Sequence, residues 1–198
     1  MEGLKNKKIR VAIFASGAGS NAEKIMATFK NHAYIEVCLV ICNKPQAGVL
    51  EIAQKNYVPV LLINKVDFFS DKSCLNELKQ QEISWIILAG FLWKIPTALT
   101  QAFAGKMVNI HPALLPKYGG KGMYGHHVHE AVILNKEKES GITIHYVDEI
   151  YDHGSIILQK KCSVSDTDNA DSLANKIHKL EHEWYAKTIE EIILKAKA

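Results

Sequence analysis

The residues best suited to chemistry in this chain are an asparagine and a histidine, Asn109 and His111, two positions apart. They belong to the apolar run 107–111, which predicts a short buried strand. Successive side chains of a strand point to opposite faces, so these two share one face. Pro112 cannot donate to a sheet ladder and ends the strand, which places the pair at its rim. There the amide can donate to a developing oxyanion, and the imidazole can move a proton.

A second candidate is the glycine-containing turn at 15–21, which follows a strand-like run and opens a helix-like segment. Glycines let the backbone turn tightly and approach an anion, and a helix start offers N–H groups to it. The third glycine of a dinucleotide fingerprint is missing, and no Gly-Lys-Ser/Thr of a P-loop follows. A phosphate-binding turn and a plain tight βα turn both remain open. The residues that would bind the phosphate are Gly17, Gly19, Ser20 and Asn21.

Three further side chains could join the same site. Asp152, in the turn 151–154, could orient the imidazole of His111 and favour its protonated form, although Asp-x-Gly is also a common turn. His145 lies on the strand-like run before that turn, where it could face the cleft or simply pack. Glu181 is expected on a solvated face of the last helical segment, unless that helix folds back over the cleft.

The loop 119–125 contains four glycines in seven residues, which indicates a mobile segment that could act as a lid. Three histidines follow closely, His126, His127 and His129, but no Asp or Cys nearby completes an obvious metal-binding set. The sequence therefore predicts no metal site here.

Composition restricts the class of protein. The chain has 198 residues, 47% hydrophobic and 23% charged, which is typical of one globular α/β domain. A net charge of +3 is too small to indicate a nucleic-acid surface, and the basic run 5–8 is interpreted as a solvated flank. No apolar run approaches 18 residues and no signal core opens the chain, so we expect a cytoplasmic protein outside the membrane. Cys38 and Cys42 lie in an apolar run and are expected to be buried free thiols.

Strand-like runs alternate with helix-like periodic segments along the chain. Strands are predicted at 9–16, 34–42, 58–63, 85–90, 107–111, 141–147 and 155–164. Helices are predicted at 21–30, 49–56, 67–81 (with Asp67 as N-cap), 96–103, 124–135 and 168–197. This alternation predicts an open, mostly parallel sheet with helices on both faces, and an antiparallel last pair would make the sheet mixed. Ligands of such sheets bind beyond the carboxyl ends of the strands, so one cleft is expected to hold the glycine turn and the Asn/His pair.

These pieces, in this order, resemble the phosphoribosylglycinamide formyltransferase family over nearly the whole chain. The landmarks are Gly17-Ala18-Gly19-Ser20-Asn21, Leu88-Ala89-Gly90-Phe91, Asn109-Ile110-His111-Pro112 with Leu114-Leu115-Pro116, Gly141-Ile142-Thr143-Ile144-His145, and the Asp152 turn. The resemblance implies a Rossmann-like formyltransferase fold in one domain, 1–198. It divides that domain into a phosphate-binding part, about 1–105, and a catalytic and folate-binding part, about 106–198. It also implies transfer of a formyl group from 10-formyltetrahydrofolate to the amine of glycinamide ribonucleotide (GAR) in purine biosynthesis.

The resemblance gives each candidate a role. Asn109, His111 and Asp152 match the catalytic trio of the family, and Glu181 matches the acid that recognises the substrate amine. The glycine turn would hold the substrate phosphate. The folate-binding residues would be Leu88, Gly90, Phe91, Ile95, Val147 and Asp148. The partners implied are these two small molecules, with no metal, nucleic acid or membrane, and the chain would be a monomer or a homodimer.

The chain departs from the common family pattern at several places. Ala113 stands where many relatives have serine, Trp93-Lys94 where many have arginine, and the loop 119–125 is longer than usual. No arginine around Phe68-Phe69 matches one that some relatives use near the phosphate.

Three other functions are alternatives to GAR formylation. Methionyl-tRNA formyltransferase usually has a further C-terminal domain and a basic surface, and formyltetrahydrofolate hydrolase has an N-terminal regulatory domain. The low net charge disfavours the methionyl-tRNA enzyme, and a first strand at about residue 9 disfavours the hydrolase. A non-catalytic folate or nucleotide binding module is disfavoured by the intact Asn, His and Asp.

Overall fold

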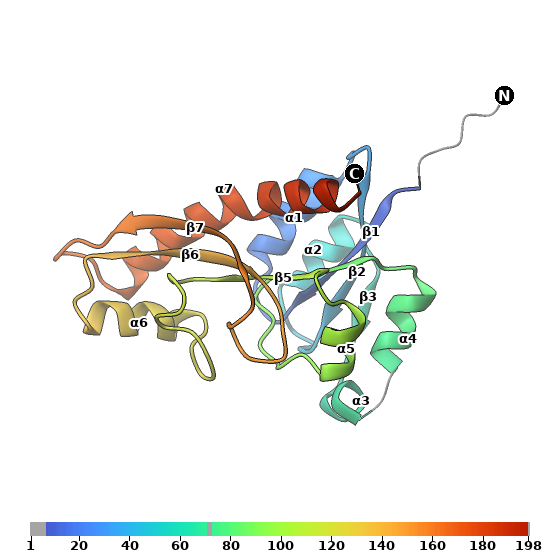
Figure 1. Cartoon of the computed structure of the whole chain (residues 1–198), viewed down its shortest axis with the longest axis horizontal. Helices are drawn as coiled ribbons and strands as arrows, with labels where there is room; N and C mark the ends of the chain where they lie inside the picture. Colours follow the sequence, from blue (N-terminus) through green and yellow to red (C-terminus); the bar gives the residue numbers. More distant parts are fainter. Residues whose placement is uncertain (1–6, 71–72, 198) are drawn as a thin grey trace. The chain divides into compact units, whose positions relative to one another are not determined.

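The computed structural model describes residues 7–70 and 73–197 and contains two compact units that divide after Phe91 (Figure 1). Residues 5 and 6 of the basic run lie outside the described residues. The expectation of a single domain over the whole chain stays a prediction.

The first unit alternates strands with helices, as predicted. Its elements are β1 (Ile9–Ala15), α1 (Ser20–Phe29), β2 (Ile35–Cys42), α2 (Val49–Lys55), β3 (Val60–Leu62), α3 (Lys65–Ser70), α4 (Ser73–Gln80) and β4 (Trp85–Leu88). The strand order is β3-β2-β1-β4, and all three pairs are parallel. β1 pairs with a strand on either side, β2 and β4, which explains why it is a nearly continuous apolar run.

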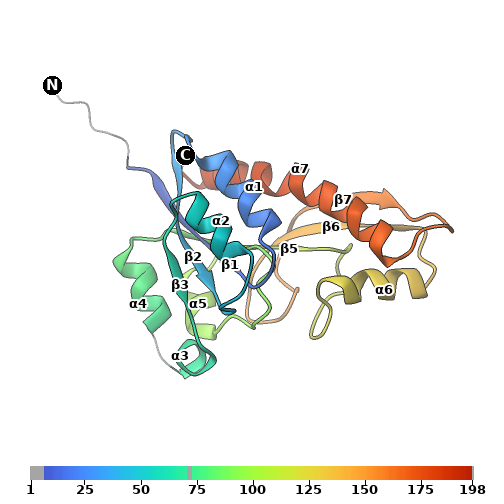
Figure 2. The same cartoon turned by 180° about the vertical axis from the view of Figure 1, so that it is seen from behind.

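Helices α1 and α2 lie side by side in this unit (Figure 2). The buried residues of α1 recur three or four positions apart, so one stripe of the helix faces the core. They are Ala22, Ile25, Met26 and Phe29.

The start predicted for the helix over 67–81 is wrong, because α3 already begins at Lys65; α3 and α4, from Ser73, cover most of the predicted range. Residues 71 and 72 are not described. The predicted N-cap is also wrong, because Asp67 lies inside α3 and its amide donates to Asn64 Oδ1 at 3.0 Å. The cap therefore lies three residues earlier, where an asparagine has the side-chain acceptor that a helix start requires.

The second unit contains the antiparallel strands of the protein. Its elements are α5 (Thr97–Ala102), β5 (Met107–His111), α6 (His126–Leu134), β6 (Glu139–Tyr146), β7 (Ile156–Ser163) and α7 (Ala170–Lys197). β6 pairs antiparallel with both β5 and β7, which confirms the expected antiparallel last pair and the mixed strand directions.

Helix α7 packs along β6 and β7 (Figure 1). Most of its buried residues recur every four positions and form one stripe, which consists of Leu173, Ile177, Glu181, Tyr185, Ile189 and Ile193. The only charged member of that stripe is Glu181, at 6% exposure. The expectation of a solvated face for this residue is therefore wrong.

Cys38 and Cys42 are buried free thiols, as predicted, and burial raises the pKa of Cys38 to about 11. In the described part of the chain, no helix combines the length and the apolar character that crossing a membrane requires.

One buried histidine in the second unit predicts a pH-dependent stability. His129, on α6, is 3% exposed, and its Nδ1 has no hydrogen-bond partner among the described residues. Desolvation lowers its pKa from 6.5 to about 4. Between these values the unfolded chain binds a proton that the folded chain does not, so stability falls as the pH falls through this window. The loss amounts to about 3 kcal/mol.

We therefore expect His129→Leu to flatten the loss of thermal stability between pH 6.5 and 4.5, measured by calorimetry. His127→Gln, an exposed change on the same helix, should keep the wild-type dependence. Parallel curves for wild type and His129→Leu would contradict this assignment.

Candidate active site

The Asn/His pair lies where the sequence places it, at the end of β5, which stops at His111. The antiparallel register sets Asn109 directly opposite His145 of β6 and sets His111 opposite Thr143. Directly opposed residues of an antiparallel pair bring their side chains close together. The register of β5 and β6 therefore brings His145 to the asparagine.

Hydrogen bonds fix the ring of His145 and, through it, the amide of Asn109. The ring Nδ1 lies 2.8 Å from the Tyr146 carbonyl, to which it can only donate. Its Nε2 is then the acceptor for Asn109 Nδ2 at 3.1 Å. Desolvation lowers the pKa of His145, which favours this neutral tautomer. The amide nitrogen of Asn109 is thus held in one orientation, with its second hydrogen available for another acceptor.

One ring nitrogen of His111 is hydrogen-bonded to the backbone, and the other faces a carboxylate. Its Nε2 donates to the carbonyl of Tyr118 at 2.7 Å, and the ring is 3% exposed. Its Nδ1 faces Oδ2 of Asp152 at 3.6 Å, which is longer than a direct hydrogen bond. Any proton that this side chain exchanges must therefore pass through Nδ1.

Asp152 connects the two histidines. Its Oδ1 lies 3.7 Å from Nε2 of His145, and its Oδ2 accepts the amide of Gly120 at 2.8 Å. Its backbone adopts a left-handed φ of +53°, which aspartate tolerates better than most residues. Two amino acids later, a Cβ on Gly154 would clash with the Tyr146 carbonyl oxygen, so this turn requires glycine. The turn thus delivers the carboxylate to the histidines, as the sequence predicted.

Sequence reasoning missed Tyr118 and Gly120, which contact the site through their backbone carbonyl and amide. Both have positive φ, +57° and +94°, in the loop that leads to α6. Both contacts are made by backbone atoms, so the residue types at these two positions do not reveal them.

Glu181 lies in the same unit and accepts a hydrogen bond from Nδ1 of His178 at 3.0 Å. This carboxylate raises the pKa of His178. Of the three clustered histidines, His126 contacts Asp171 and Glu130, His127 contacts Glu130, and His129 is buried. Among the described residues, no group of three or more His, Cys, Asp or Glu could hold a metal ion.

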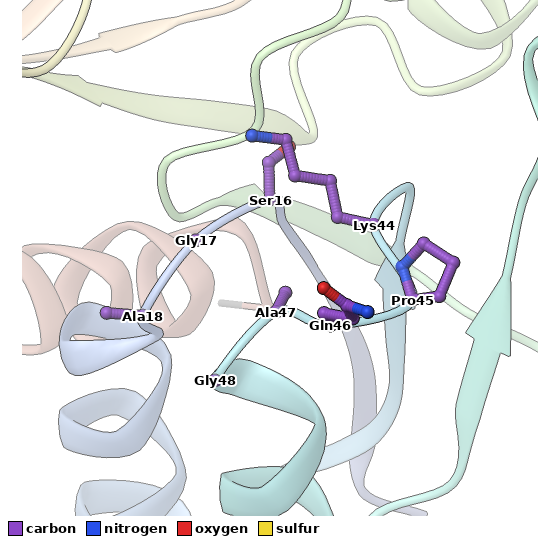
Figure 3. A pocket seen from close by; sticks show the side chains of 8 residues that line it. All are labelled: Ser16, Gly17, Ala18, Lys44, Pro45, Gln46, Ala47 and Gly48. Atoms are coloured by element: carbon purple, nitrogen blue, oxygen red, sulfur yellow. The ribbon is translucent and has the colours of Figure 1, made fainter.

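The glycine turn belongs to the first unit, where it lines a pocket of about 550 Å³ together with the loop 44–48 (Figure 3). Gly19 has a φ of +88°, and a Cβ there would lie 2.8 Å from Val49 Cα, so the turn requires glycine. Of the predicted phosphate-binding residues, Gly17 lines this pocket and Gly19 and Ser20 follow directly. Sequence reasoning missed Lys44, which lines the pocket at the end of β2.

The predicted folate-binding residues are distributed over both units. In the first, the Gly90 carbonyl accepts the Ser16 amide at 3.1 Å, and the ring of Phe91 packs edge-on against Phe14. Leu88 is buried there. In the second, Ile95 is buried, the Val147 amide donates to Met107, and Asp148 accepts the Ile150 amide at 2.8 Å. Their role in binding folate stays a prediction.

Residues 9–189 match the model of the formyl transferase family. A phosphoribosylglycinamide formyltransferase from Bacillus subtilis (strain 168) is 37% identical over 191 residues, which cover 93% of this chain and 94% of that protein. The chain therefore belongs to the formyl transferase family and, within it, to the phosphoribosylglycinamide formyltransferases.

Two further comparisons support the same family. The chloroplastic phosphoribosylglycinamide formyltransferase of Vigna unguiculata is 38% identical over 189 residues, 93% of this chain. This chain spans only 61% of the length of that plant protein. The crystal structure of the Bacillus halodurans phosphoribosylglycinamide formyltransferase superimposes with a TM-score of 0.85 at 37% identity and covers 94% of this chain and 96% of that one. The predicted α/β fold with a mixed, mostly parallel sheet is thereby confirmed.

Proposed function

We propose that this protein transfers the formyl group of 10-formyltetrahydrofolate to the amine of GAR. The observation that carries the proposal is the buried network of Asn109, His145, Asp152 and His111 at the end of β5. Relatives that are 37–38% identical to it are named phosphoribosylglycinamide formyltransferase, which supports formyl transfer to GAR.

The chemistry begins with the neutral amine of GAR, which attacks the formyl carbon and turns the formyl oxygen into an oxyanion. Asn109 has one amide hydrogen bonded to His145, so its second hydrogen can donate to that oxyanion. Donors fixed in advance cost no reorganisation in the transition state, and one such donor typically contributes about 10²–10³ in rate.

His111 is the second donor, through Nδ1. In the protonated ring, Nε2–H stays on the Tyr118 carbonyl and Nδ1–H can stabilise the oxyanion. Asp152 stabilises the positive ring, and its 3.6 Å separation from Nδ1 suits a proton relay through water. The proton released by the amine passes along that route to N10 of the folate as the bond between N10 and the formyl carbon breaks, and tetrahydrofolate leaves.

The remaining assignments complete the proposal. The glycine turn, with Gly17, Gly19, Ser20 and Asn21, binds the phosphate of GAR, and Glu181 recognises its amine. Folate contacts the six residues predicted for it, and no metal takes part. The protein acts in the cytoplasm on these small molecules, as a monomer or a homodimer.

The proposal is tested by mixing the purified protein with 10-formyltetrahydrofolate and measuring tetrahydrofolate release with and without GAR. We expect release only when GAR is present. Equal release without GAR would identify a hydrolase instead, and no release with it would refute the assignment.

A positioning role for His145 predicts an effect transmitted through the asparagine. His145→Leu leaves the amide of Asn109 without its acceptor, so we expect kcat to fall about tenfold with KM nearly unchanged. Asn109→Ala should be equally slow with either residue at position 145. If the double variant instead lost the product of the two separate decreases in kcat, His145 would act independently of Asn109.

A further inference from the structure

The pocket beside the glycine turn has a feature that the proposed function does not use. It is lined by the residues 16–18 after β1 and the residues 44–48 after β2 (Figure 3). Both segments follow the carboxyl ends of parallel strands, the edge at which open α/β sheets bind their ligands.

Close backbone packing fixes the two segments against each other. The amide of Val49 donates to the Gly17 carbonyl at 3.2 Å. A Cβ on Gly48 would lie 2.9 Å from the carbonyl oxygen of Ala18, and one on Gly19 would lie 2.8 Å from Val49. The walls of the pocket are therefore set by the backbone, and a ligand meets a preformed site.

Lys44 is anchored at the rim of this pocket. Its amide donates to Cys42 Sγ at 3.4 Å, and its carbonyl accepts the Cys42 thiol and the Ala47 amide at 3.3 and 3.2 Å. Pro45 follows, and a proline restricts the backbone of the residue before it. The backbone from which the ammonium group extends is thus well defined.

The charge of Lys44 is not neutralised by the protein. It is the one charged residue among those that line the pocket, and in the described ranges, 7–70 and 73–197, no carboxylate forms an ion pair with it. The other lining residues contribute hydroxyl, amide and backbone groups. A preformed pocket with one lysine and no acid favours an anionic ligand.

We propose that Lys44 pairs with the phosphate of a 5-phosphoribosyl ligand and makes the protein prefer phosphorylated over unphosphorylated substrates. A phosphate monoester carries a charge of about −1.5 to −2 at pH 7, and a lysine ammonium binds it as a point charge with three donors. The inference rests on the proposed function in that the ligand is GAR, but the pairing itself can be measured without formyl transfer.

The direct test is a titration of the protein with ribose 5-phosphate and with ribose, followed through backbone amide NMR signals. We expect ribose 5-phosphate alone to shift the signals of residues 16–20 and 44–48. Lys44→Met should weaken its binding about tenfold, and Lys44→Arg should largely restore it. Lys55→Met removes an exposed lysine of α2 that pairs with Glu51, and it should bind like the wild type. Unchanged affinity in Lys44→Met, or equal binding of ribose, would overturn the proposal.

A kinetic test separates this inference from the proposed function. For the wild type, kcat/KM should be much higher for GAR than for its dephosphorylated analogue, and Lys44→Met should lower only the value for GAR. If the wild type transfers no formyl group, the proposed function fails while the NMR test of Lys44 still stands. If transfer proceeds and Lys44→Met leaves the preference for GAR intact, only the role of Lys44 fails.

Discussion

Replacing His111 with alanine is expected to lower kcat for formyl transfer by about 10³-fold, while the protein still binds folate with nearly unchanged affinity. The imidazole faces the Asp152 carboxylate through Nδ1, which is the nitrogen left for chemistry. Alanine removes both the oxyanion donor and the route of the proton. The rate is measured with GAR and 10-formyltetrahydrofolate at saturation, and folate binding by fluorescence titration.

Because His111 is buried, its removal could also destabilise the protein by leaving the Tyr118 carbonyl without a donor. His111→Gln, which keeps a donor and most of the volume, should restore the melting temperature without restoring turnover. His127→Ala, an exposed change on α6, should leave the rate unaffected. Turnover near the wild-type rate in a folded His111→Gln protein would remove His111 from the mechanism.

Asp152→Asn is expected to lower kcat by about 10²-fold with little change in KM. Asparagine keeps the shape of the side chain, tolerates the left-handed φ of +53° and can still accept the Gly120 amide. What it lacks is the negative charge that stabilises a protonated His111 and accepts a proton through water. The measurement is steady-state kinetics of this variant and of the wild type at several pH values.

The matched control for this change is Asp166→Asn, which removes a carboxylate that pairs with Lys138 on the surface. Its kcat should equal that of the wild type. If Asp152→Asn were as active as this control, the carboxylate would serve only to shape the turn, which was the alternative left open by its Asp-x-Gly sequence.

Much of the geometry of the candidate site could be predicted because it depends on local rules. The two-residue period of a strand places Asn109 and His111 on one face, and Pro112 ends the strand beside them. The glycine turn follows from β1 and from the backbone conformations that only glycine adopts easily. These features need no knowledge of which elements pack together.

The remaining features depend on tertiary contacts that residue types do not reveal. Tyr118 and Gly120 act through backbone atoms, which every residue possesses. Glu181 is charged, and charged residues are rarely buried, so its place in the apolar stripe of α7 contradicts the usual pattern. Nothing in the sequence distinguishes Lys44 from other lysines, because the pocket beside it forms only when the segments 16–18 and 44–48 pack together.

The most direct measurement of the central claim uses 10-formyltetrahydrofolate labelled with ¹³C in the formyl group. After incubation with the protein and GAR, NMR and mass spectrometry locate the label. The proposed chemistry predicts that the label appears on the former amine of GAR as a formamide, in a one-to-one ratio with tetrahydrofolate. It also predicts that the label stays on the donor with the His111→Ala protein. Label recovered as free formate, or a formamide formed equally fast by that variant, would contradict it.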